Sequence, residues 1–90
     1  MRHELFEERR AIESISHRER IRILQEAEDC IQAATNFREY RACERQESKA
    51  RKALRARLQP RLRAFRAKMR TYRILHREAG RHPSSLPDER

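Results

Sequence analysis

The sequence predicts an all-α protein, built as a helical hairpin or a three-helix bundle with a long, basic C-terminal helix. Three observations favour this class: charged residues make up 41% of the chain, glycine occurs once and proline three times, and apolar residues recur at steps of three and four. Ninety residues make one domain with a small core, which we expect to span residues 1–81, followed by a flexible tail at 82–90.

Two helix-start signals divide the expected bundle. Ser16 is followed three residues later by Glu19, which fits the capping box that opens many helices, and Asn36 with Glu39 repeats the pattern. These signals predict helices over about residues 2–14 and 17–34, and a third from about residue 37. The inward faces expected for the first two helices carry Leu5, Ile12 and Ile15, and then Leu24, Ala27, Ile31 and Ala34.

Pro60 interrupts the third helical pattern. Proline lacks a backbone donor but suits a first helical position, so the chain either kinks here within one long helix or starts a fourth helix. We expect a kink, because Gln59 is a poor N-cap. The pattern resumes after Pro60 and stops at Gly80, where a left-handed cap is expected.

Charge is distributed unevenly along the chain. Residues 1–48 hold nine Lys/Arg and eleven Asp/Glu, whereas residues 49–82 hold thirteen and one. The formal net charge of +9 would attract nucleic acid, an anionic membrane surface or an acidic protein. A charge asymmetry of this size indicates an interaction surface in the C-terminal half.

Two parallel rows of side chains follow the third helix. An apolar row recurs at steps of three and four and should be buried; it comprises Leu54, Leu58, Leu62, Phe65, Met69 and Tyr72. A second row is displaced around the helix by about 100° and is entirely cationic. This basic row comprises Lys52, Arg55, Arg63, Arg66, Arg70, Arg73 and Arg77. Such a row could follow a phosphate backbone while the apolar side docks on the other helices.

Two other interpretations of the basic row are open. The arginines could simply flank a coiled-coil seam and pair with acids of the N-terminal half, for which the candidates are Glu4, Glu7, Glu8, Glu26, Glu28 and Asp29. The helix could instead lie on an anionic membrane surface. The membrane interpretation is the weaker one, because the chain has no Trp and its apolar row is narrow. We expect no membrane partner.

The two cysteines stand on either side of the turn expected at Thr35 and Asn36. An antiparallel hairpin would bring Cys30 opposite Cys43, and that geometry permits a disulfide. The first 16 residues carry four Glu instead of an apolar signal core, so we expect a cytoplasmic location. Two reduced, buried cysteines are therefore the favoured state, with the disulfide as the alternative.

The sequence offers no recognisable catalytic or metal-binding motif. A glycine-rich phosphate loop and a nucleophile elbow are both missing, and His3, His17, His76 and His82 form no ligand pair at metal-site spacing. We therefore expect neither an enzyme nor a cofactor.

The function expected from these features is binding of nucleic-acid backbone, RNA or DNA, with a regulatory or accessory role. The alternative is a helical adaptor or inhibitor that binds an acidic protein surface within a larger assembly. We also expect a homodimer, packed through the long apolar seam of Leu58, Leu62, Phe65, Met69 and Tyr72.

Overall fold

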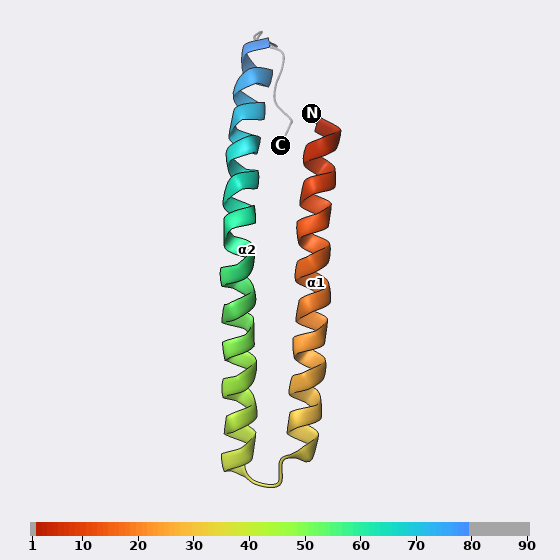
Figure 1. Cartoon of the computed structure of the whole chain (residues 1–90), viewed down its shortest axis with the longest axis vertical. Coiled ribbons are helices and arrows are strands. Elements are labelled where there is room, and N and C mark those ends of the chain that lie inside the picture. Colours follow the sequence, from red (N-terminus) through yellow and green to blue (C-terminus); the bar gives the residue numbers. More distant parts are fainter. Residues whose placement is uncertain (1, 80–90) are drawn as a thin grey trace.

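The computed structural model describes residues 2–79, which form a hairpin of two long antiparallel helices (Figure 1). Helix α1 spans Arg2–Ala33 and helix α2 spans Phe37–Ala79. Together they form a rod with principal extents of 65 × 22 × 17 Å. The all-α class and the hairpin are confirmed, whereas the three-helix bundle is wrong. The predicted cap at Gly80 and the tail at 82–90 lie outside the described residues.

Helix α1 runs through the predicted break at Ser16 without interruption. No Gly or Pro lies between Arg2 and Ala33, so nothing in this segment terminates a helix once it has started. The buried residues Ile12 and Ile23 lie on one side of the helix only if it is continuous. Side-chain pairs three and four residues apart, such as Arg9 with Glu13, also span the region. The capping-box pattern at Ser16 therefore does not start a second helix.

The second start signal is confirmed and opens α2. The Asn36 side-chain oxygen Oδ1 accepts a hydrogen bond from the backbone N–H of Glu39 at 2.9 Å. The Glu39 carboxylate in turn accepts hydrogen bonds from the backbone N–H of Thr35 at 2.7 Å and from its hydroxyl at 3.0 Å. These bonds lower the pKa of Glu39, with the backbone N–H of Thr35 as the largest cause. The cap thus satisfies backbone donors that the start of a helix leaves unpaired.

Helix α2 continues across Pro60, so no fourth helix forms, and Figure 1 shows no sharp bend of the kind expected at this residue. Proline removes the hydrogen bond that would reach the carbonyl of Ala56. Both residues are exposed, which leaves that carbonyl accessible to water.

The core lies between the two helices and consists of two small clusters that share Leu62. One cluster joins Leu5 and Ile12 of α1 to Phe65 of α2, with Leu62, Met69 and Tyr72 packed against it. The other joins Ile23 of α1 to Leu54 and Leu58 of α2, with Ile15, Ala50 and Leu62 around it. The predicted apolar row of α2 is therefore the side that meets α1.

The predicted inward face of α1 is correct except at one position. Ala27 is buried and Ile31 is half-buried, as expected. Leu24 is instead 56% exposed, and its neighbour Ile23 takes the inward position. The error follows from the break assumed at Ser16: a continuous helix fixes the inward face from Ile12 onward, and that face selects Ile23 rather than Leu24.

Candidate nucleic-acid interface

The seven residues of the basic row lie on the side of α2 that faces away from α1. In a helix with 3.6 residues per turn, the row is centred about 130° from the buried positions of α2. All seven side chains are exposed. Within residues 2–79, none of the seven takes part in an ion pair or a side-chain hydrogen bond. The structure therefore brings the predicted site residues together on one open surface without internal neutralisation.

Internal ion pairs of α2 involve other cations. Lys68 lies near α1 and contacts Glu8 at 3.0 Å, and Arg57 reaches Glu19 at 4.0 Å. Arg51 pairs with Glu47 one turn earlier, at 3.5 Å. Pairing between the helices is thus found beside α1, where carboxylates are within reach, and no ion pair among the described side chains involves the basic row.

Most acids of α1 are engaged by α1 itself. Glu7 accepts a hydrogen bond from Arg10, and Glu26 accepts one from Arg22. Glu28 and Asp29 accept hydrogen bonds from glutamines four residues away. Arg22 also donates to Glu19, and this hydrogen bond is the main cause of the lowered pKa of Glu19. The structure does not show these acids neutralising the basic row. Glu8, one of the acids proposed for that role, pairs with Lys68, which is outside the row.

The basic row is longer than the sequence pattern suggested. Four further cations continue it toward the hairpin turn on the same side of α2: Arg38, Arg41, Arg45 and Lys49. All four are exposed, and within the described residues none has an ion pair. Their spacing of three and four residues could have revealed them. They were missed because Glu39, Glu44 and Glu47 lower the net charge of the segment, although Glu39 and Glu47 lie on other sides of the helix and Glu44 lies outside the edge of the row.

The seam residues predicted to form a homodimer contact α1 instead. Leu58 is 6% exposed and Phe65 is 5% exposed, and both pack against residues of α1. The dimer was expected because this apolar seam had nothing else to cover it. The structure removes that reason, and the homodimer itself stays a prediction.

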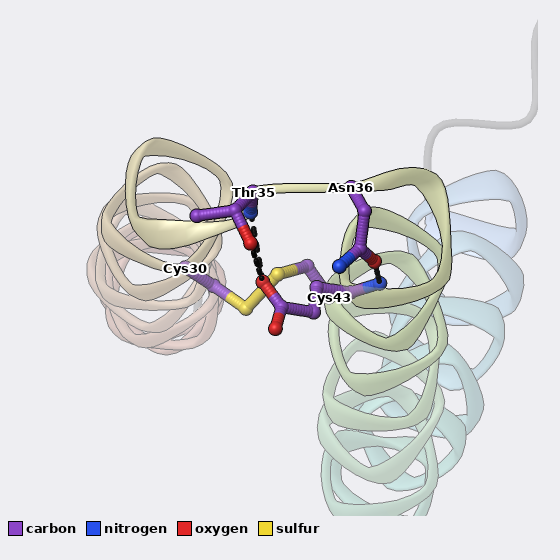
Figure 2. The surroundings of a disulfide bond; sticks show 5 residues. Cys30, Thr35, Asn36 and Cys43 are labelled. Atoms are coloured by element: carbon purple, nitrogen blue, oxygen red, sulfur yellow. Dashed lines mark hydrogen bonds between the residues drawn. A yellow bond between two sulfur atoms is a disulfide. The ribbon is translucent and has the colours of Figure 1, made fainter.

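The turn end of the hairpin is closed by a disulfide between Cys30 and Cys43 (Figure 2). Their Cα atoms are 5.7 Å apart, within the range that a disulfide requires. Figure 2 shows the bond crossing from α1 to α2 directly behind the capped turn at Thr35 and Asn36. The reduced pair favoured from the sequence is thus wrong for this structure, and the alternative is the state observed.

No shielded polar site is found in the part of the chain that the structure describes. The buried residues of this part are all hydrophobic, and no group of three or more His, Cys, Asp or Glu side chains could hold a metal ion. Neither helix, over its described length, is apolar enough to cross a membrane.

Comparisons with known proteins add no further assignment. No family model matches the chain, and neither the curated proteins nor the solved structures contain a significant match. The geometry and charge of α2 are therefore the features from which a function can be inferred.

Proposed function

We propose that this protein binds the phosphate backbone of nucleic acid through the basic row of α2. The observation that carries the proposal is the position of the row: seven exposed cations lie on one side of one helix, and among the side chains that the structure describes no carboxylate pairs with any of them. Six of the seven are arginines, whose planar guanidinium groups bind phosphate with two parallel hydrogen bonds.

Repulsion within the row supports an anionic ligand. Arg66 and Arg70 are one helical turn apart, as are Arg73 and Arg77, and like charges at this spacing destabilise a helix by a few tenths of a kcal/mol per pair. A phosphate backbone would relieve this repulsion. It would also release its condensed counterions, which is the main source of affinity in sequence-independent binding.

The proposed binding depends little on base sequence. The row consists of long cationic side chains on a smooth helical surface, and such side chains contact phosphates more readily than they read base edges. A small backbone-binding protein of this kind fits a regulatory or accessory role better than a catalytic one.

The cytoplasmic location proposed for the protein decides whether its two cysteines are bonded or reduced. Disulfides persist in oxidising compartments, whereas cytosolic reductants keep most thiols reduced. In the cytoplasm, the location proposed from the sequence, Cys30 and Cys43 would be thiols, and no covalent bond would join the two helices beside the turn.

The proposal can be tested by fluorescence anisotropy with random duplex DNA and with single-stranded RNA at physiological salt. We expect the wild-type protein to bind with a dissociation constant of about 10⁻⁶ to 10⁻⁴ M. The test variant replaces four cations of the row by Gln: Arg63, Arg66, Arg70 and Arg73. A matched control removes the same charge from other sides of α2 by replacing Arg51, Arg57, Arg61 and Lys68 with Gln.

The two variants separate a local surface from net charge. We expect the row variant to lose most of the affinity and the control to keep most of it, with both remaining helical by circular dichroism. Equal loss in both variants would show that only net charge matters. No binding of the wild-type protein to either nucleic acid would refute the proposal and would favour the acidic-protein alternative.

A further inference from the structure

The cationic surface of α2 continues along almost the whole helix. The extended row consists of the basic row together with Arg38, Arg41, Arg45 and Lys49. Its eleven members occupy an arc of about 120° around the helix. The other side chains in that arc are uncharged: Phe37, Ser48, Ala56, Gln59, Ala67 and Ile74.

The extended row is straight and long. From Arg38 to Arg77 it covers about 58 Å at a rise of 1.5 Å per residue, with a cation about every 6 Å on average. Helix α2 runs without a break over this distance (Figure 1). A ligand that engages the whole row must therefore place phosphates along a nearly straight line of this length.

A nucleic-acid duplex does not meet this requirement. Each backbone winds around the duplex once in about 34 Å, so a straight row lying outside it meets phosphates only where it crosses a strand. The major groove is about 12 Å wide, which accommodates one helix. The groove winds around the duplex with the strands, so a straight helix can follow it over only part of a turn, and most of the extended row would leave the groove.

A single strand can follow the row, and the turn end of α2 offers a contact for its bases. The side chain of Phe37 is 76% exposed and lies at the edge of the arc of the extended row, about 40° from Arg41 around the helix. The ring of Tyr40 packs against it edge-on, with 6.4 Å between the ring centroids. This leaves the ring of Phe37 open to stack on a base, and a single strand presents base faces for stacking without the cost of unstacking a duplex.

We infer that the ligand of this surface is a single-stranded nucleic acid that lies along the whole of α2, with its phosphates on the extended row and one base stacked on Phe37. The inference rests on the proposed function. At the stacked spacing of about 3.4 Å per nucleotide, the row would take up about 17 nucleotides, and fewer if the strand is more extended.

The first experiment measures the salt dependence of binding to an unstructured oligouridylate of about 24 nucleotides. The variant replaces Arg38, Arg41, Arg45 and Lys49 with Gln, and the control is the off-row Gln variant at Arg51, Arg57, Arg61 and Lys68. Each phosphate contact on a single strand contributes about −0.7 to the slope of log K against log salt. We expect the slope to become shallower by about 3 in the variant and to stay unchanged in the control.

The length dependence gives a second measurement on the same two proteins. Affinity should rise with oligouridylate length until the row is filled. The row that remains in the variant, from Lys52 to Arg77, is about 38 Å long. The saturating length should therefore fall by about one third relative to wild type, whatever the rise per nucleotide.

The base contact is tested by replacing Phe37 with Ala and with Trp. We expect the Ala variant to bind about tenfold more weakly with an unchanged salt slope, and the Trp variant to bind as well as wild type. A duplex of the same length should bind more weakly than the single strand.

Distinct results overturn the inference and the proposed function. Suppose that the wild-type protein binds single strands. The inference is then wrong, although backbone binding stands, if the Gln variant at residues 38, 41, 45 and 49 keeps the wild-type salt slope or if Phe37→Ala binds with wild-type affinity. The same holds if a duplex binds at least as tightly as the single strand. If wild type binds no nucleic acid, the proposed function fails as well.

Discussion

Removal of the disulfide between Cys30 and Cys43 should lower the free energy of unfolding by about 3 kcal/mol. The two cysteines are separated by 13 positions, and closing a loop of this length removes about 3 kcal/mol of conformational entropy from the unfolded chain. Packing does little to compensate at this end of the hairpin, because the two hydrophobic clusters lie farther from the turn. In a domain of this size, 3 kcal/mol corresponds to a fall in Tm of about 12–24 °C.

Thermal unfolding followed by circular dichroism measures this effect. The oxidised protein is compared with the same protein under a thiol reductant and with the variant Cys30→Ser, Cys43→Ser. The reductant should lower the Tm of the wild type and leave that of the variant unchanged. Free-thiol titration before heating confirms that the bond is formed. A fall in Tm of less than about 4 °C on reduction of a fully bonded sample would refute the reasoning.

Three further perturbations test the fold. Replacing Asn36 with Ala should cost about 0.5–2 kcal/mol, measured by urea unfolding, whereas Asp at this position should keep the cap and most of the stability. Replacing Ile12, which is 1% exposed, with Ala should cost about 2–5 kcal/mol in the same assay; a loss below 1 kcal/mol would contradict the packing of the helices. The pKa of Glu39 is lowered by its bonds to Thr35, so its contribution is complete above the unfolded pKa near 4.5 and is lost as pH falls through the folded value. Wild type should therefore lose more Tm than Glu39→Gln on acidification; equal losses would show that the carboxylate does not hold the turn.

The sequence predicted which residues are helical better than it predicted how many helices they form. The capping box at Asn36 and the apolar row of α2 both have the predicted roles. The same capping pattern at Ser16 proved misleading, because a capping residue begins a helix only where the preceding residues are not already helical. Local patterns do not contain that information. The inward face that runs continuously from Ile12 to Ile23 does show that the helix is unbroken at Ser16. This continuity is visible only when α1 is treated as one helix.

The pairing of the two helices could not be fixed from local patterns. The spacing of Cys30 and Cys43 permitted a disulfide without requiring it. The seam around Phe65 could equally have packed against a second copy of the chain, because an apolar row does not specify its partner. Once α1 packs along α2, it covers the seam and the disulfide geometry follows.

The basic row was predictable because it depends on helical period alone. Its exposure was not, since it depends on which acids of α1 come within reach of α2. The structure shows Lys68 and Arg57 beside α1 carboxylates and the row on the far side of the helix. The part of the row from Arg38 to Lys49 was missed because the net charge of a segment does not show which side of the helix each charge occupies.

Arginine side-chain NMR gives the most direct test of the central claim that the outward side of α2 is the binding surface. The Nε–Hε signals of the wild-type protein are followed as single-stranded oligouridylate is added at physiological salt. We expect large shifts for arginines of the row, such as Arg66, Arg70 and Arg73, and small shifts for Arg57 and Arg61 on other sides of α2. Shifts of equal size in both groups, or no shifts at a saturating concentration, would contradict this claim.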